Sequence, residues 1–223
     1  MNRTPAYTRY SAGGGGGAHR DPARANRSRR RAVRRRRLAV LAGLALVAVA
    51  MIVWFGPGEK AIRELTLPLR HEDIIRQQAR EKNLDPALIA AVIYQETKFR
   101  PRTSAAGAEG LMQVLPSTAR FLARRTGGIK FVPSDLSTPQ VNISYGCYYL
   151  RYLTDHYSGN LTLAIAAYNA GLSNVDGWVQ RAGGPQRFNT SDIPFSETRA
   201  YVASVRQHRR EYRKHYAREL GYR

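Results

Sequence analysis

An unbroken apolar run over residues 38–55 limits what this chain can fold into more than any other feature. Its 18 residues are close to the shortest length that crosses the hydrocarbon core of a bilayer as a helix. Four arginines at residues 34–37 precede it, and by the positive-inside rule this end stays in the cytoplasm. We therefore predict a single transmembrane helix, an uncleaved signal anchor, with everything after it exported. A cleaved signal peptide is the alternative, because Ala48 and Ala50 could belong to a cleavable stretch.

The formal net charge of +20 suggests nucleic-acid binding until it is located along the chain. Residues 1–37 hold twelve arginines and one acid, and residues 199–223 hold eight basic and two acidic residues. The middle of the chain is only slightly basic. A membrane-tethered nucleic-acid binder would account for the charge and for no other feature of the sequence. We therefore expect no specific nucleic acid as a partner. With glycine at every position of 13–17, residues 1–37 are predicted to form a disordered cytoplasmic tail.

The exported part is predicted to contain a linker at residues 56–70 and one all-α domain at residues 71–223. Gly56-Pro57-Gly58 ends the apolar helix, and no alternating strand pattern persists in the domain. Capping residues such as Asn160 and Ser196 support helix starts. The expected helices cover residues 71–82, 86–98, 116–126, 139–157, 161–169, 173–182 and 196–217.

Cysteine and histidine usage argues against a metal or cofactor site. Cys147 is the only cysteine, which excludes an intramolecular disulfide and any multi-cysteine zinc site. The five histidines show no spacing typical of metal ligands. We predict no metal and no cofactor, and Cys147 as a small core residue.

Glu96 lies on an apolar helical stripe, an unusual place for a carboxylate. Asp85 and Pro86 predict a helix start, with a side-chain acceptor followed by a residue that has no amide hydrogen. A buried carboxylate is costly to ionise, so its pKa should rise, which suits a general acid. On periodicity alone, a glutamate at the stripe's edge that reaches water is the commoner explanation. The stripe residues one and two turns before Glu96 are Ile93, Val92 and Ile89.

The connection over residues 100–115 follows this helix directly and is rich in turn-forming residues. Pro101, Ser104, Gly107 and Gly110 predict a tight, backbone-rich loop. Such a loop could orient Glu96 and line a groove, or it could simply join two helices.

Four blocks of residues, in order, resemble one known family. They are 96–119 (Glu-Thr-Lys-Phe-Arg-Pro, then Ser-Ala-Ala-Gly-Ala-Glu-Gly-Leu-Met-Gln-Val-Leu-Pro-Ser-Thr-Ala), 142–150 (Asn-x-x-x-Gly-x-x-Tyr-Leu), 166–171 (Ala-Ala-Tyr-Asn-Ala-Gly) and 194–202 (ending Glu-Thr-x-x-Tyr-Val). Together they resemble the SLT domain of lytic transglycosylases, the goose-lysozyme-like enzymes that cleave peptidoglycan. The resemblance spans residues 71–215 and implies a lysozyme-like helical fold. Thr97 and Leu115 depart from the family's more frequent serine and methionine, but Thr97 keeps the hydroxyl and Leu115 the apolar contact.

The resemblance implies that Glu96 is the catalytic residue. Most glycosidases need two carboxylates, and the next acids here are Glu109 in the loop and, in a matched block, Glu197. The family implies a single essential carboxyl group, which protonates the glycosidic oxygen between N-acetylmuramic acid and N-acetylglucosamine. The substrate's N-acetyl group stabilises the cationic centre. Glu96 then acts as base on the 6-hydroxyl, which closes a 1,6-anhydro ring.

The remaining site residues are expected to bind substrate. Tyr168 and Asn169 are expected to hydrogen-bond the N-acetyl group or Glu96, with a core tyrosine as the alternative for Tyr168. The candidates for lining the sugar groove are the side chain of Gln113 and the backbone near Ser104 and Met112. These three residues could instead stabilise the loop. Glu197 is also expected to bind substrate, or it could instead stabilise the start of the helix that follows Ser196.

These observations lead to a membrane-anchored lytic transglycosylase whose partners are peptidoglycan glycan strands and the bacterial cytoplasmic membrane. Its catalytic domain is expected on the extracytoplasmic side. A hydrolytic, lysozyme-like or chitinase-like enzyme on the same fold is the nearest alternative. A non-catalytic peptidoglycan-binding scaffold is the third.

Overall fold

The computed structural model describes residues 22–55, 57–127 and 132–222. The first 21 residues of the predicted disordered tail therefore lie outside the described residues. The chain forms two compact units, Met1–Glu59 and Lys60–Arg223.

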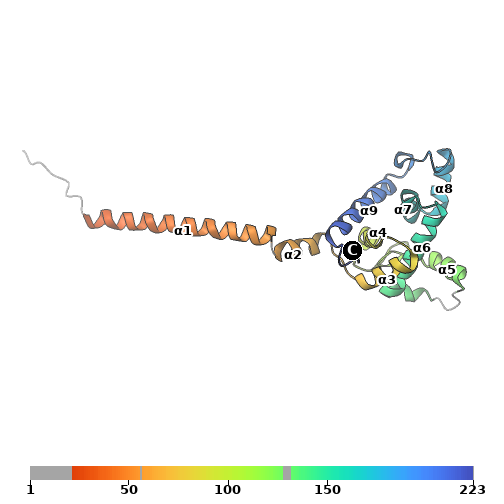
Figure 1. Ribbon diagram of the computed structural model, residues 1–223, viewed down its shortest axis with the longest axis horizontal. Helices are drawn as coiled ribbons and strands as arrows, with labels where there is room; N and C mark the ends of the chain where they lie inside the picture. Colours follow the sequence, from red (N-terminus) through yellow and green to blue (C-terminus); the bar gives the residue numbers. More distant parts are fainter. Residues whose placement is uncertain (1–21, 56, 128–131, 223) are drawn as a thin grey trace, which may run out of the picture. The chain divides into compact units, whose positions relative to one another are not determined.

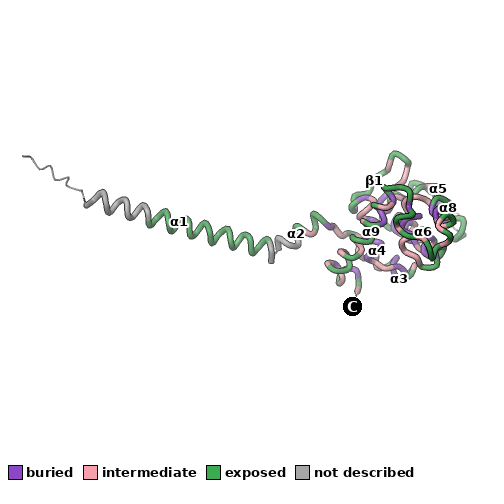
Figure 2. Tube along the Cα trace, turned by 90° about the horizontal axis from the view of Figure 1, so that it is seen from above, coloured by how far each residue is buried: buried purple, intermediate pink, exposed green. Residues whose placement is uncertain are grey.

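The first unit contains one long helix, α1 (Pro22–Phe55). Its segment Val33–Val53 is the one described helix long and apolar enough to cross a membrane, and all of that segment is exposed (Figure 2). Anchors and cleaved signal sequences share this length and composition. The helix covers residues 22–37 of the predicted disordered tail, so that prediction differs from the structure there. Arginine and alanine, which dominate this segment, are both strong helix formers.

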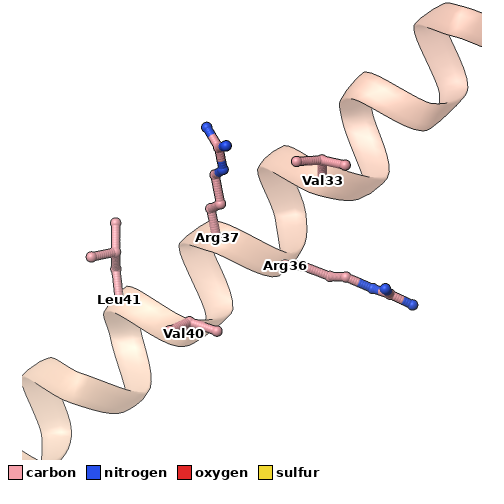
Figure 3. Close-up of a pocket in the computed structure, with 5 residues that line it drawn as sticks. All are labelled: Val33, Arg36, Arg37, Val40 and Leu41. Carbon is pink, nitrogen blue, oxygen red and sulfur yellow. The ribbon is translucent and has the colours of Figure 1, made fainter.

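A shallow hollow on α1 marks the boundary between its cationic and apolar segments. Figure 3 shows Arg36 and Arg37 beside three apolar side chains of the same helix. The hollow offers guanidinium groups but no carboxylate, hydroxyl or amide side chain, so it is no candidate for sugar chemistry. The apolar residues are Val33, Val40 and Leu41.

The second unit is helical, as predicted (Figure 1). The seven expected helices are confirmed, each within two residues of its predicted bounds. Two short 3-10 helices, Pro133–Ser137 and Thr190–Asp192, complete the described connections. The helices are α3 (Glu72–Lys82), α4 (Pro86–Thr97), α5 (Pro116–Thr126), α6 (Pro139–His156), α7 (Leu161–Ala170), α8 (Leu172–Arg181) and α9 (Ser196–His215).

Helix α4 is the central helix of this unit and packs against α3 and α9 (Figure 1). All residues from 87 to 93 are buried, and a helix that is apolar all round belongs in a core. Its start is fixed as predicted, since Asp85 accepts a hydrogen bond from the amide of Ala87 at 3.0 Å. The carboxylate of Asp85 also pairs with Arg209 of α9 at 2.6 Å, which ties the start of α4 to the second half of α9.

The loop after α4 contains a very small antiparallel ribbon that the sequence did not predict. Strand β1 (Arg102–Thr103) pairs with β2 (Glu109–Gly110). Two residues per strand are too few to show an alternating pattern. The all-α fold class is otherwise confirmed.

The predicted linker at residues 56–70 is not a free tether along its whole length. Helix α2 (Pro57–Thr66) occupies most of it, and the second unit begins at Lys60. Arg63 donates to the carbonyl of His215 at 3.1 Å. Three tyrosine hydroxyls, one from α4, one from α9 and one from the residue after α9, donate to main-chain carbonyls that follow Arg63. These contacts join residues far apart in the chain, so local sequence cannot reveal them. These bonds are Tyr94 to Thr66 O (2.8 Å), Tyr212 to Pro68 O (2.6 Å) and Tyr216 to Leu67 O (2.8 Å).

Candidate active site

Glu96 lies one residue before the end of α4 and is held by a residue from α9. The hydroxyl of Tyr201 donates to Oε1 of Glu96 at 2.6 Å. Tyr201 is itself only 6% exposed, so its ring position is fixed by the core. A hydrogen bond to a carboxylate is shorter and stronger than one between neutral groups. The carboxylate is therefore oriented by the contact between two helices, not by its own rotamer alone.

Burial raises the pKa of Glu96 above its ordinary value. The hydrogen bond from Tyr201 and the charge of Arg102 act in the opposite direction but do not cancel the effect of burial. A raised pKa keeps a larger fraction of the carboxyl group protonated near neutral pH. This protonation state is the one that a general acid needs.

Arg102 connects Glu96 to the loop that follows it. Its guanidinium donates to the main-chain carbonyl of Glu96 at 3.0 Å. This bond satisfies an oxygen in the last turn of α4, where carbonyls have no partner within the helix. Strand β1 thus lies against the end of α4, beside the carboxylate.

Tyr168 of α7 lies near the same carboxylate. Burial raises its pKa well above the ordinary value, and the charge of Glu96 raises it further. Its hydroxyl donates to the main-chain carbonyl of Met112 at 2.9 Å. The structure thus brings Glu96, Tyr168 and Tyr201 together from three helices, α4, α7 and α9.

Asn142 of α6 fixes the loop segment that carries Met112. It is fully buried, and its side chain makes three hydrogen bonds. Its oxygen accepts from the amide of Met112 at 2.8 Å, and its nitrogen donates to the carbonyls of Glu109 (2.8 Å) and Leu136 (3.0 Å). The chain of contacts therefore runs from Asn142 to Met112 and on to Tyr168.

Two glycines allow this loop to approach α6 closely. A methyl group at Gly146 would lie 2.5 Å from the sulfur of Met112. A methyl group at Gly110 would lie 2.3 Å from Nδ2 of Asn142, and its backbone φ of 73° also favours glycine. The Asn-x-x-x-Gly spacing thus places a hydrogen-bonding side chain and a gap one helical turn apart, facing the same loop.

The other predicted loop residues stabilise the loop itself. The side-chain amide of Gln113 donates to the carbonyls of Arg102 (2.7 Å) and Gly110 (2.9 Å). Ser104 accepts from the amide of Ala108 at 3.0 Å. Met112 is fully buried. Gln113, Ser104 and Met112 therefore stabilise the loop, which was the alternative role for them. Their contacts with sugar remain predictions.

The remaining candidates lie at the junction of α7 and α9. Asn169 accepts a hydrogen bond from the hydroxyl of Thr198 at 2.7 Å. Glu197 is exposed in the first turn of α9, and among the described residues no hydrogen bond joins it to Glu96. Glu109, the other nearby acid in sequence, accepts from the hydroxyl of Thr103 at 2.8 Å. Glu96 is therefore the carboxylate that the fold places with the buried Tyr201 and the partly buried Tyr168.

Three residues of this site were missed by sequence reasoning: Tyr201, Asn142 and Arg102. The first two lie inside blocks that had been singled out, and both are polar residues at positions that face the core. That combination could have indicated them. Arg102 offered no such signal, because its bond to the end of α4 depends on the path of the loop.

The described residues contain no group of three or more His, Cys, Asp or Glu side chains that could hold a metal ion. Cys147 is fully buried in the core, as predicted, and burial raises the pKa of its thiol far above the ordinary range. An inert structural cysteine fits these surroundings.

Residues 73–190 match the family model described as the transglycosylase SLT domain. Among curated proteins, the soluble lytic murein transglycosylase of Salmonella typhimurium is 34% identical over 148 residues, covering 64% of this chain. The membrane-bound lytic murein transglycosylase C of Salmonella arizonae is 30% identical over 164 residues, covering 63% of this chain. The chain spans 23% of the first relative's length and 46% of the second's.

Solved structures resemble the fold as well as the sequence. The 70-kDa soluble lytic transglycosylase of Escherichia coli aligns with a TM-score of 0.64 and 31% identity, over 72% of this chain and 28% of that chain. An inactive mutant of the lytic transglycosylase Slt of Pseudomonas aeruginosa aligns with a TM-score of 0.63 and 30% identity, over 81% of this chain and 30% of that chain. The mutation in that structure replaces a glutamate with glutamine.

Proposed function

The chain belongs to the transglycosylase SLT domain family, and we propose that it is a membrane-anchored lytic transglycosylase of peptidoglycan. Its proposed reaction breaks the β-1,4 bond between N-acetylmuramic acid and N-acetylglucosamine and leaves a 1,6-anhydro ring on the muramic acid. The observation that supports this most is the half-buried carboxyl group of Glu96, with a raised pKa and a 2.6 Å hydrogen bond from Tyr201.

In the first step, protonated Glu96 gives its proton to the glycosidic oxygen, and the bond to C1 of the muramic acid breaks. Oε1 is engaged by Tyr201, so Oε2 is the oxygen that delivers the proton. The developing positive charge at C1 is stabilised by the N-acetyl group of the same sugar, as in substrate-assisted glycosidases. This assignment fits a site in which, among the described residues, one carboxylate and not two lies with Tyr168 and Tyr201.

In the second step, ionised Glu96 takes the proton of the sugar's 6-hydroxyl, whose oxygen then bonds to C1. The ring closes, no water is consumed, and Glu96 regains its proton. A residue that acts as acid and then as base works best with a pKa near ambient pH. Burial moves the pKa of Glu96 upward in that direction, while Tyr201 and Arg102 limit the rise.

The substrate contacts are also proposals. Tyr168 and Asn169 are the proposed partners of the N-acetyl group, supported by the position of Tyr168 near Glu96. The proposed lining of the sugar groove comes from the ribbon and the loop after it, which lie against the end of α4. The proposed lining is the side chain of Gln113, the backbone near Ser104 and Met112 and, at the start of α9, Glu197.

Relatives support this chemistry by what their names state. Proteins similar to this chain are described as lytic murein transglycosylases, both soluble and membrane-bound. The Pseudomonas aeruginosa enzyme is described as inactive when a glutamate becomes glutamine. Loss of activity from that single change fits an essential glutamate in the family.

The proposed location is the cytoplasmic membrane, with the catalytic unit on the cell-wall side. The apolar helix Val33–Val53 and the arginines at residues 34–37 support this orientation. Measuring the mass of the mature protein tests it, since an uncleaved anchor keeps residues 1–55. A mature chain that begins after the apolar run would contradict anchoring and indicate a cleaved signal sequence.

Digestion of isolated peptidoglycan tests the proposed activity and the proposed acid together. The full chain should release soluble muropeptides, and Glu96→Gln should release none above background. Glu81→Gln is the matched control, because Glu81 is an exposed carboxylate of α3 bonded to Gln77, and it should cleave at the normal rate. No release by the unmodified chain would instead indicate a non-catalytic binding domain.

A further inference from the structure

A second groove of the Lys60–Arg223 unit lies between the end of α2 and the end of α4 and has a volume of about 630 Å³. Three cationic side chains line it, Arg70, Lys98 and Arg100, against one acid, Glu64. Leu65 and Tyr94 contribute to the same wall. The groove therefore combines net positive charge with exposed apolar surface.

Helix α2 presents two different faces within this unit. On one face, Arg63 donates to the carbonyl of His215 and lies 5.6 Å from the centre of the Tyr216 ring. On another face, Leu65 is 85% exposed and Ile62 is 49% exposed. These two residues are three apart and so adjacent on the helix surface. The helix is thus fixed to its unit through Arg63 while its apolar face has no covering among the described residues.

The exposed cations line the same groove as Leu65 of this apolar face. Tyr94 donates to the carbonyl of Thr66 at 2.8 Å, which joins the end of α2 to α4. Lys98 is the residue that caps α4, and its amide donates to the carbonyl of Tyr94 at 2.9 Å. An exposed leucine beside cations suits the surface of an anionic phospholipid bilayer. Such a bilayer offers apolar acyl chains to the leucine and anionic headgroups to the cations.

The covalent chain keeps this surface near the end of the apolar helix. Leu65 follows Phe55, the last residue of α1, by only ten positions. Because most of that stretch is α2, the distance along the chain is at most about 20 Å. A bilayer entered by α1 would therefore have its headgroup layer within reach of α2.

We propose that Ile62, Leu65, Arg70, Lys98 and Arg100 form a docking surface for an anionic phospholipid membrane. The leucine and isoleucine enter the headgroup boundary, and the three cations bind lipid phosphates. This interaction goes beyond the proposed enzymatic activity and needs no cleavage to be observed.

Docking at this surface would set the direction in which the site faces. Tyr94 lines the groove, and Glu96 follows it by two residues, which is about 200° around a helix. A membrane seated at the groove therefore has the carboxylate on the other side of α4. The proposed acid would face away from the lipid and toward the wall.

The test uses the full chain in vesicles of phosphatidylcholine alone or mixed with equal phosphatidylglycerol. A polarity-sensitive fluorophore is attached at position 62 through Ile62→Cys, since the native Cys147 is buried and does not label. The reference label is at Gln180→Cys, on an exposed position of α8. The label at position 62 should move to shorter emission wavelength and be quenched by lipid-borne quenchers in the anionic vesicles, while the reference should not change.

The charge variant Arg70→Gln, Lys98→Gln, Arg100→Gln should lose this response. Salt at about 1 M, where the Debye length falls to about 3 Å, should reduce it in the unmodified chain. Circular dichroism and thermal unfolding of the same variant report on folding and should match those of the unmodified chain. Because the fluorescence needs no catalysis, failure of the enzymatic proposal leaves this test intact.

An equal signal at positions 62 and 180, or an unchanged signal in the charge variant, would overturn the proposal. So would a charge variant that loses binding to isolated cell wall while its vesicle signal persists. That last outcome would assign the groove to a wall polymer.

Discussion

Tyr201 donates its hydroxyl hydrogen to Oε1 of Glu96 at 2.6 Å, joining residues 105 positions apart in the sequence. This bond connects α9 to the end of α4, where the half-buried carboxylate of Glu96 lies. It stabilises the ionised carboxylate, while burial stabilises the protonated form. The pKa of Glu96 therefore depends on a hydrogen bond that can be removed by deleting one atom, the hydroxyl oxygen of Tyr201.

Tyr201→Phe should lower kcat/KM for peptidoglycan fragments by about tenfold or more, since a hydrogen bond to a charged group contributes about 1.5–3 kcal/mol. The same change should shift the pH profile. Without the donor, the pKa of Glu96 rises further. Activity that needs the protonated acid is lost as pH rises through that pKa, so the alkaline limb should move to higher pH. A limb that moves to lower pH would contradict this account of Tyr201.

Glu96→Gln should stabilise the folded chain at neutral pH by about 1 kcal/mol, because it removes a carboxylate whose charge is costly to bury. The folded pKa of Glu96 is raised, so the folded state binds its proton more tightly than the unfolded state, whose pKa is about 4.3. The stability of the unmodified chain therefore falls as pH rises between these values. Denaturant unfolding should show the variant's advantage growing over this window and vanishing at lower pH.

Glu81→Gln supplies the control for that measurement. Glu81 is exposed, and its pKa is lowered chiefly by the hydrogen bond from Gln77. Its replacement should give no advantage that grows with pH. The same growth in both variants would mean that burial of Glu96 is not the cause.

Asn142→Ala should destabilise the chain by about 3 kcal/mol, because three hydrogen bonds of a fully buried side chain are lost. The loop residue Met112 would lose its anchor, so activity should fall even at temperatures where the variant is folded. Asn174→Ala is the matched control, since the side chain of Asn174 is exposed and donates to the carbonyl of Ala170, at the end of α7, at 2.7 Å. Equal losses in the two variants would show that the loop does not depend on Asn142.

Gly146→Ala should destabilise the chain even though alanine is the better helix former by about 1 kcal/mol. The added methyl would lie 2.5 Å from the sulfur of Met112, and overpacking typically costs about 1–3 kcal/mol. Gly177→Ala on α8 meets only Arg181 at 3.5 Å and should instead be stabilising. Thermal unfolding of the two variants measures both signs, and a stabilised Gly146→Ala would contradict the close packing of this loop on α6.

The sequence was sufficient for the fold because its strongest signals are local. Asp85 and Pro86 start α4, and Asn160 starts α7, each through hydrogen bonds within a few residues. These signals predicted the seven helices of the second unit. The order of residues 60–70 could not be predicted in this way, because these residues are held by tyrosines that lie far along the chain.

The candidate site shows the same limit. Glu96 could be found, since an acid on an apolar stripe is a local anomaly. Periodicity could mark Tyr201 as a core-facing polar residue but could not identify Glu96 as its partner, because a buried tyrosine looks the same whether its hydroxyl meets a carboxylate or a carbonyl. Gln113 shows the converse. It looked like a sugar ligand, and its amide is occupied by the loop's own carbonyls.

The most direct test of the central claim is the mass of the fragments released from purified peptidoglycan by the full chain. The account predicts muropeptides that end in 1,6-anhydro-N-acetylmuramic acid, each lighter by one water than the hydrolytic product, and none from Glu96→Gln. Reducing muramic acid ends from the unmodified chain, or undiminished anhydro products from Glu96→Gln, would contradict it.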